Sequence, residues 1–318
     1  MRLFQTIAFN ILTCAGAVRG QTMLNQFSVP FDYQPSVPFF EFSQFAAPDG
    51  SGGMLLFALT DNSLRRFDST GKQLWSAAFN FGSAQGAVAA MAVTADGVLL
   101  GGQVTGALPG QTSAGSYDAF AAKYDFKGNN LWIKQFGTAN GEYTRAIAIN
   151  AAGFYTLGVS DGPNRLFIRS SDANGNEIWT RYFNDPSLVD IMGGSADATG
   201  IYFFGEELKG YNVLRKFDSS GNDVLSYAFD PAAIITGAAP DGQGVYVSHL
   251  ELPANYVSRI DLTGHEVWKR QMPASDVATM IVTDGTGFYI AGGVDAALPG
   301  QCYAGNGDTW VEIGRAHV

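Results

Sequence analysis

Short apolar segments separated by Gly-containing turns run along almost the whole chain. The segment 146–149 (AIAI) is followed by a turn and then by Gly153, Phe154 and Tyr155. The same order of strand, Gly turn and strand continues at Gly200-Ile201-Tyr202, Gly244-Val245-Tyr246 and Gly287-Phe288-Tyr289. Short segments of this composition, bounded by Gly, are typical of strands, and no stretch shows helical periodicity of useful length. The pattern predicts an all-β protein.

A second pattern alternates with the first and places an Asp, a Gly and a Trp at fixed spacing. The Asp can accept backbone N–H bonds at the start of a turn, and the Gly supplies the positive φ that closes it. The Trp begins the next strand and can fill the wedge between neighbouring sheets. The five copies are Asp68, Gly71 and Trp75; Asp125, Gly128 and Trp132; Asp172, Gly175 and Trp179; Asp218 and Gly221, with Leu225 in the Trp position; and Asp261, Gly264 and Trp268.

Together the two patterns define a repeat of four strands, a to d. In the third repeat we expect them at 146–150, 154–159, 166–170 and 177–183. The Asp recurs at intervals within or just beyond the roughly 40 to 50 residues of a propeller blade. We therefore expect a β-propeller of four-stranded antiparallel blades over residues 21–311. Five blades are complete, at 41–79, 87–136, 143–183, 190–229 and 233–272, and a partial sixth lies at 277–311.

The composition fits this fold and limits the possible partners. The 318 residues include 39 Gly and only 15% charged residues, and the net charge is −10. A nucleic-acid partner would need clustered Lys and Arg, so a partner of this class is not expected.

Residues 1–20 (MRLFQTIAFNILTCAGAVRG) have the features of a secretory signal peptide, with a basic start, an apolar middle and small residues at the end. A membrane anchor is an alternative, but its apolar run would be short and interrupted by polar residues. A lipoprotein attached through Cys14 is another. Cleavage leaves Cys302 as the one remaining cysteine, so we expect no intrachain disulfide. It also removes the apolar stretch of residues 1–20, so we expect no transmembrane segment in the mature protein. The mature protein is expected to be secreted, periplasmic or on the cell surface.

The two ends of the propeller region carry segments outside the repeat pattern. Residues 312–318 (EIGRAHV) fit no repeat position and resemble a translated sequencing adapter, so we expect them to be non-native. The sixth blade then lacks its d strand, and the natural chain is expected to continue, with six or more blades. The segment 23–31 (MLNQFSVPF) has aromatic residues spaced as in the d strands. We expect it to pair with the last blade and close the ring.

The repeat resembles that of a known family. Residues 107–115 (ALPGQTSAG), 117–125 (YDAFAAKYD) and the spacing of Gly128, Leu131 and Trp132 closely resemble the SBBP repeat of secreted bacterial β-propellers, and 297–301 (ALPGQ) repeats part of it. The resemblance implies an exported bacterial propeller and no particular reaction. The frame is also similar to blade motifs of pyrroloquinoline-quinone propellers. Those dehydrogenases have an adjacent Cys pair, which this sequence lacks, so the resemblance extends to non-catalytic, quinoprotein-like scaffolds.

No set of residues forms a catalytic signature. The nucleophile motif G-x-S-x-G is absent. The segment 172–177 (DANGNE) is similar to the start of a calcium loop, but Phe183 occupies its twelfth position, where a carboxylate is needed. His249 and His265 are the candidate bases, and each is expected at the surface. We therefore predict no catalytic residue, no metal site and no cofactor.

The b-c and d-a connections vary in length and share one side of the ring, here called the variable face; the a-b and c-d turns form the opposite turn face. Loop variation on a rigid scaffold is typical of recognition surfaces. Acids outnumber bases on the variable face and tyrosines accompany them, which suits carbohydrate, cation or basic-peptide binding. The candidate binding residues are Glu142, Tyr143, Arg145, Asp185, Asp190, Glu206, Glu207, Tyr211, His249 and Asp276.

Two functions follow from these observations. The favoured one is a monomeric, non-enzymatic module that binds a protein or carbohydrate ligand. The alternative is a propeller enzyme, such as a lactonase-like hydrolase, a lyase or a sugar dehydrogenase, with a metal or cofactor in the central channel. An enzyme needs polar side chains that converge on one point, whereas the predicted a strands contain mostly Ala, Ile, Met and Val.

Overall fold

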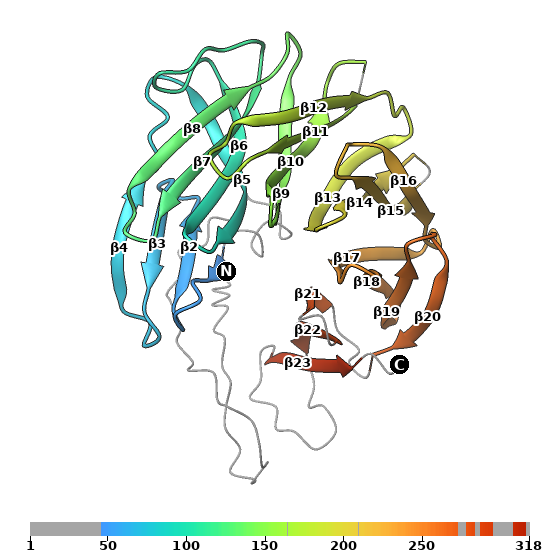
Figure 1. Ribbon diagram of the computed structural model, residues 1–318. Coiled ribbons are helices and arrows are strands. Elements are labelled where there is room, and N and C mark those ends of the chain that lie inside the picture. Colours follow the sequence, from blue (N-terminus) through green and yellow to red (C-terminus); the bar gives the residue numbers. More distant parts are fainter. Residues whose placement is uncertain are drawn as a thin grey trace, which may run out of the picture.

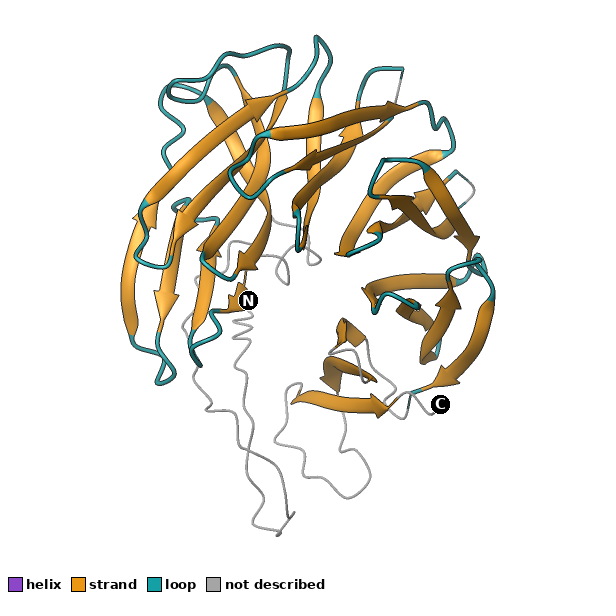
Figure 2. Ribbon diagram, in the orientation of Figure 1, coloured by secondary structure: helices purple, strands orange, loops and turns teal. Residues whose placement is uncertain are grey.

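The computed structural model describes residues 46–163, 165–208, 210–272, 278–283, 287–294 and 308–315. Regular structure in these ranges is β-strand (Figure 2), and no helix there is long and apolar enough to span a bilayer. Five antiparallel sheets have four strands and a sixth has three, with neighbouring strands consecutive in sequence. Figure 1 shows the sheets side by side around a common centre, the first strand of each innermost. The predicted β-propeller is confirmed.

Each sheet is one blade. Blade 1 contains β1 (Ala46–Pro48), β2 (Met54–Ala58), β3 (Ser63–Phe67) and β4 (Gln73–Ala78). Blade 2 contains β5 (Gln85–Thr94), β6 (Gly97–Thr105), β7 (Asp118–Asp125) and β8 (Asn130–Phe136). Blade 3 contains β9 (Glu142–Asn150), β10 (Gly153–Ser160), β11 (Leu166–Ser171) and β12 (Glu177–Phe183). Blade 4 contains β13 (Leu188–Asp197), β14 (Gly200–Glu207), β15 (Tyr211–Asp218) and β16 (Asp223–Ala228). Blade 5 contains β17 (Ala233–Pro240), β18 (Gly244–Glu251), β19 (Ala254–Asp261) and β20 (Glu266–Gln271), and blade 6 contains β21 (Ala278–Thr283), β22 (Gly287–Val294) and β23 (Asp308–Arg315).

The turn between the c and d strands is organised by its Asp, as the sequence predicted. In blade 2 the Asp125 carboxylate accepts N–H bonds from Lys127 and Asn129, both at 2.9 Å, and Gly128 has a φ of 87°. The same bonds recur at Asp68, Asp172, Asp218 and Asp261, and positive φ recurs at Gly71, Gly175, Gly221 and Gly264. Because each carboxylate serves its own turn, these residues shape the blades.

Each d strand contains a β-bulge immediately before the Trp position. In blade 2, Lys123 pairs with Trp132 and Tyr124 pairs with Asn130, so Leu131 is an extra, unpaired residue. The extra residue is apolar and about half exposed in all five complete blades: Leu74, Leu131, Ile178, Val224 and Val267. A bulge twists an edge strand and disfavours pairing with another chain. The outer edges of these blades are protected in this way.

The Trp that follows the bulge contacts the next blade. Trp132 of blade 2 stacks on Phe154 of blade 3, with ring centroids 5.9 Å apart. Trp75 Nε1 donates a hydrogen bond to the Phe126 carbonyl of blade 2 at 2.9 Å. The prediction that the Trp side chains pack between blades is confirmed. The equivalent contacts further along the ring are Trp179 Nε1 to the Ser219 carbonyl and Trp268 to the ring of Phe288.

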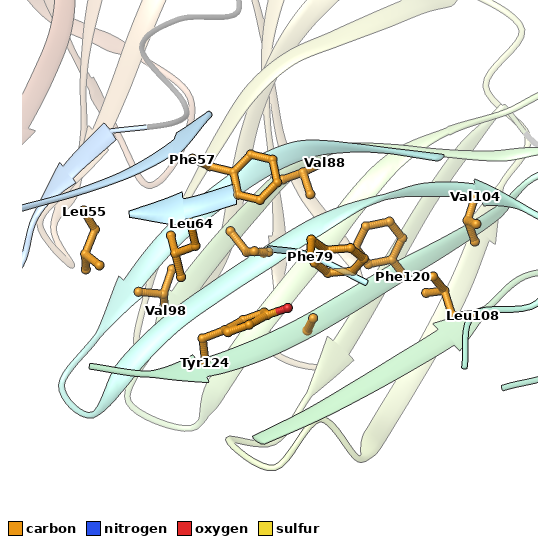
Figure 3. Close-up of a cluster of buried hydrophobic side chains, with 12 residues drawn as sticks. Leu55, Phe57, Leu64, Phe79, Val88, Val98, Val104, Leu108, Phe120 and Tyr124 are labelled. Atoms are coloured by element: carbon orange, nitrogen blue, oxygen red, sulfur yellow. The ribbon is translucent and has the colours of Figure 1, made fainter. Parts of the chain in front are cut away.

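The core consists of apolar layers between neighbouring blades. Figure 3 shows the layer between blades 1 and 2, in which Phe79 lies beside Phe120. Phe79 follows the first d strand, and its ring centroid is 5.1 Å from that of Phe120 in β7. The Phe79 ring is also 6.4 Å from that of Tyr124, and the repeat makes the equivalent contact between blades 3 and 4, where Phe183 lies 4.5 Å from Phe217. Burial of one such ring contributes roughly 1.5–3 kcal/mol, so these layers hold each blade to the next.

The strand boundaries correct the sequence prediction at two places. β9 begins at Glu142, because the a strand continues past its apolar part. β23 continues through Arg315 and pairs Ile313 with Tyr289, so residues 312–315 occupy a c-strand position. The partial blade therefore extends past its predicted end at residue 311, since a backbone pairs through N–H and C=O groups whatever the side chain. That residues 312–318 are non-native stays a prediction. Residues 1–20, predicted to be a signal peptide, the segment 23–31 and Cys302 lie outside the described residues.

Candidate functional site

The variable face is built largely from strand ends. Glu142 pairs with Ser160 in blade 3, and Leu188 pairs with Glu207 in blade 4. Of the predicted binding residues, eight lie in strands: Glu142, Tyr143, Arg145, Asp190, Glu206, Glu207, Tyr211 and His249. The prediction that the acids among them lie in connections is wrong. Asp185 does lie in a d-a connection, and Asp276 lies outside the described residues.

Glu142 is fully buried and holds the connection between blades 2 and 3. Its carboxylate accepts hydrogen bonds from Thr138, from N at 2.9 Å and from Oγ1 at 2.6 Å. Asp118 is also fully buried and accepts N–H bonds from Ala114 at 2.9 Å and Gly115 at 3.1 Å. Burial raises the pKa of Glu142. Glu142 therefore organises the chain beneath the surface, and a ligand on the variable face cannot reach it.

An aromatic pair lies beside this connection. The rings of Tyr117 and Tyr143 are tilted by 38°, with centroids 5.1 Å apart. The Asp161 carboxylate accepts the Gly141 N–H at 2.5 Å. Burial and the charge of Asp161 raise the pKa of Tyr143, so its hydroxyl stays protonated and can donate a hydrogen bond. Tyrosine rings next to a carboxylate provide both apolar faces and hydrogen-bonding groups.

Arg145 and Asp190 join two neighbouring inner strands, β9 and β13. Arg145 Nε lies 2.8 Å from Asp190 Oδ1. Arg145 is the extra residue of a bulge in β9, and the equivalent bulge residues of β5, β13 and β17 are Ala89, Met192 and Thr236. These four positions of the innermost strands carry one charged side chain, and it is bound to a carboxylate.

Asp185 also serves the fold. It forms an ion pair with Arg215 of β15, and it accepts a hydrogen bond from Ser187 Oγ at 2.7 Å. Arg215 also binds Asp223 of β16. Burial opposes the charge of Asp185, but hydrogen bonds from Ser187 and the charge of Arg215 lower its pKa overall. This network ties the connection before β13 to β15 and β16, so Asp185 is not an uncommitted carboxylate.

His249 is buried inside the ring and is not a surface residue. Its side chain is 1% exposed and lies near the rings of Phe229 and Tyr256, at centroid distances of 5.0 and 5.7 Å. Its Nε2 is 2.9 Å from Ser258 Oγ. Burial lowers the pKa of His249 to about 4, so the imidazole is neutral at pH 7. The surface prediction is wrong because β18 is buried on both faces, and His249 packs against Phe229 of the preceding blade. His265 is exposed, as predicted.

The ends of blades 4 and 5 carry exposed apolar side chains that the sequence analysis missed. Their exposed fractions range from 37% for Val189 to 79% for Leu252. Glu206 is exposed and Glu207 half-buried beside them. A usable signal was an aliphatic residue, Leu252, in a short connection where no turn requires one. We call the following set the apolar–acidic patch: Val189, Glu206, Glu207, Leu208, Tyr211, Ile234 and Leu252.

Other places on the described surface offer less chemistry. No group of three or more His, Cys, Asp or Glu side chains in the described ranges is arranged to hold a metal. A groove of about 710 Å³ on the turn face is lined by Pro48, Asp49, Arg66 and Phe126, among others. Arg66 Nε binds Asp49 at 2.8 Å, and its Nη1 donates to the Phe126 carbonyl at 2.9 Å. Arg66 and Asp49, two charged side chains of this groove, are thus paired with each other.

No protein-family model matches the chain, and no curated protein matches it. Solved propeller structures do match. The chain is 14% identical to puromycin hydrolase, with a TM-score of 0.52, and covers 81% of its own length and 43% of the hydrolase. It is 15% identical to the pyrroloquinoline-quinone-bound aldose sugar dehydrogenase from Streptomyces coelicolor, with a TM-score of 0.50. The match covers 85% of this chain and 94% of the dehydrogenase. It is 12% identical to the Dos1 propeller, with a TM-score of 0.48. This match covers 76% of this chain and 63% of the Dos1 propeller.

These likenesses establish the propeller fold and no activity. The chain spans less than two thirds of the Dos1 propeller and of puromycin hydrolase. The hydrolase and the dehydrogenase among these structures carry out different reactions. Since unrelated functions share this fold, function has to be argued from the residues on its surface.

Proposed function

We propose that this chain is an exported bacterial β-propeller of the SBBP-repeat type that binds a protein or carbohydrate ligand on its variable face without chemical conversion. The observation that carries the proposal is the chemistry at the ends of blades 2 to 5. Exposed tyrosine and aliphatic side chains stand there among carboxylates, on strand ends held by inter-blade packing. A rigid scaffold that presents such side chains beside variable connections is typical of a recognition surface.

The alternative is a propeller enzyme with a metal or cofactor in the channel, and the similar solved structures include a hydrolase and a sugar dehydrogenase. Catalysis there needs several polar groups that converge on one point. The inner-strand bulge positions Ala89, Arg145, Met192 and Thr236 favour binding over catalysis, because their one charged side chain is paired with Asp190.

A carbohydrate ligand is favoured by one part of the face, the pair formed by Tyr117 and Tyr143. Their ring centroids lie 5.1 Å apart, and Asp161 lies next to the connection that they flank. Sugar rings pack their C–H faces on aromatic rings and exchange hydrogen bonds with carboxylates. This pair is therefore the candidate glycan subsite.

Export is part of the proposal and has its own test. Expressed in a bacterium with its own N-terminus, the chain should lose about twenty residues and leave the cytoplasm. Intact mass spectrometry of the exported fraction identifies the cleavage site. Retention of Met1 would contradict cleavage, and a lipid on Cys14 would identify a lipoprotein.

The binding proposal is tested with two probes, an array of bacterial and plant polysaccharides and a phage-displayed library of random peptides. Each ligand that binds is then incubated with the protein and analysed by mass spectrometry. We expect saturable binding, unchanged ligand, and loss of binding when the variable face is altered. Steady conversion of a bound ligand would overturn the proposal in favour of an enzyme.

A further inference from the structure

The apolar–acidic patch is one continuous surface across blades 4 and 5. In blade 4, Glu207 pairs with both Leu188 and Tyr211, so the ends of β13, β14 and β15 lie side by side. Asn212 Nδ2 donates to the Ala233 carbonyl at 2.8 Å, which joins β15 to the first residue of β17. Ala233 in turn pairs with Glu251, next to Leu252. The exposed apolar residues therefore share one side of the ring.

The apolar side chains of the patch are exposed to solvent, although no turn or strand of the fold requires an apolar residue there. Val189, Tyr211 and Ile234 are 37%, 38% and 40% exposed, and Leu208 and Leu252 reach 59% and 79%. Scattered apolar residues are normal on protein surfaces, but a contiguous group rimmed by charge marks an interaction site. The apolar residues at the d-strand bulges differ, because each stands alone on its own blade.

The charge around the patch is negative. Glu206, Glu207 and Asp230 form no ion pair with the described residues. Three basic side chains lie nearby: Lys269 is bound to Glu251, Arg215 is bound to Asp185, and Arg165 donates from Nη2 to the Val189 carbonyl at 3.4 Å. Among the described residues only Arg165 of these three has no carboxylate partner, so the acids still outnumber the free bases. Lys209 adds one positive charge in sequence and lies outside the described residues. The whole chain has a net charge of −10, so a basic partner is attracted from a distance as well as at contact.

We propose that the apolar–acidic patch docks a protein segment that presents Lys or Arg beside apolar side chains. The proposal rests on the proposed binding function and specifies its partner. Aliphatic and tyrosine side chains bury the apolar part of such a segment, and Glu206 and Glu207 pair with its cations at the rim. An anionic lipid surface or a nucleic acid is repelled by the same charges, and so is a second copy of this acidic chain.

The test uses a phage-displayed library of random peptides selected on the mature protein. Affinities of selected peptides are measured for wild type and for two independent patch variants, Leu208→Ser/Leu252→Ser and Glu206→Lys/Glu207→Lys. The matched control is Leu262→Ser, since Leu262 is 42% exposed in a c-d turn on the opposite face. Tyr117→Ser/Tyr143→Ser is measured as well, because it shows whether a selected peptide binds at the candidate glycan subsite instead of the patch. Circular dichroism verifies that each variant is folded.

We expect selected peptides rich in Lys, Arg and apolar residues, and at least about a tenfold loss of affinity in both patch variants. Affinity should also fall as NaCl rises from about 50 to about 500 mM. Unchanged affinity in both patch variants overturns the inference. If binding is then lost in the tyrosine variant, the proposed function stands with a different subsite; if binding survives every variable-face variant, both fail. Self-association seen by light scattering and lost in the patch variants would assign the patch to a second copy instead.

Discussion

The indole of Trp75 in blade 1 covers the turn glycine of blade 2, Gly128. An ideal Cβ on Gly128 would lie 3.0 Å from Trp75 Cε3, closer than ordinary van der Waals contact. Trp132 covers Gly175 in the same way, at 2.9 Å from Cζ3. Two features therefore favour Gly at this position of the repeat: the positive φ, and the Trp ring of the preceding blade, which leaves no room for a Cβ. The Asp-Gly-Trp frame therefore encodes inter-blade contact as well as a hairpin.

Replacement of Gly128 by Val should cost on the order of 2–3 kcal/mol of unfolding free energy, because the branched Cβ meets both the positive φ and the Trp75 ring. Gly264→Val is the matched control. Gly264 has a φ of +84°, but the side chain over it is Leu225, and an ideal Cβ would lie 3.7 Å away. We expect the control to cost roughly 1 kcal/mol less. Equal losses in chemical denaturation would show that the Trp75 contact contributes nothing.

Trp75→Phe should cost about 1 kcal/mol, because it removes the indole N–H that reaches the Phe126 carbonyl at 2.9 Å. The comparison is Trp132→Phe, where the indole packs on Phe154 and the structure gives no such bond among the described residues. Thermal and urea unfolding of both variants measure the difference. A loss at Trp132 as large as that at Trp75 would mean that the hydrogen bond is not what stabilises the contact.

The blades could be predicted from the sequence because their rules are local. A turn Asp accepts N–H bonds from its own next residues, and Gly at positive φ needs only its own backbone, so Asp125 and Gly128 signal a hairpin wherever they occur. Repetition then turns one hairpin into a ring. The d-strand boundaries of blade 3 match the prediction because Glu177 and Phe183 mark the turn and the last core position.

The binding residues were harder to predict because exposure depends on the neighbouring blade. Glu142 and His249 are both buried, although charge and strand-end position suggested the surface. Bulges also break the alternation on which such reasoning depends, as at Arg145 in β9. The exposed residues Leu208 and Leu252 look like core residues in sequence, and only their position beyond the strand ends leaves them in solvent.

The stability of the protein should depend on pH through His249. Burial lowers its pKa from 6.5 to about 4, whereas Glu251 opposes this shift and Lys269 adds to it. The unfolded chain takes up the proton first as pH falls, so stability is fully present above pH 6.5 and is lost as pH falls towards 4. The loss should approach about 3 kcal/mol.

Urea unfolding of wild type and His249→Gln between pH 7 and pH 4 measures this contribution. The variant should be less stable at pH 7 and show a shallower dependence on pH. His265→Gln is the control, since His265 is 81% exposed. Identical pH dependence in wild type and His249→Gln would contradict the assignment.

Closure of the ring gives a further prediction. Blade 6 has three described strands where the complete blades have four, and β23 is its outermost strand. We predict that residues 23–31 supply a fourth strand to the last blade. Deletion of residues 21–35 should lower the thermal midpoint and promote association through the uncovered edge, as measured by calorimetry and size-exclusion chromatography. An unchanged midpoint and a clean monomer would show that this segment does not close the ring.

The central claim is that the variable face binds a ligand, and hydrogen–deuterium exchange tests it most directly. Exchange is compared for the protein alone and with a saturating peptide or glycan selected on it. We predict added protection at the strand ends around Leu208 and Leu252 for a peptide, or around Tyr117 and Tyr143 for a glycan. The c-d turns at Asp125 and Asp261 on the opposite face should be unaffected. Protection confined to the turn face, or to the inner strands alone, would contradict the account.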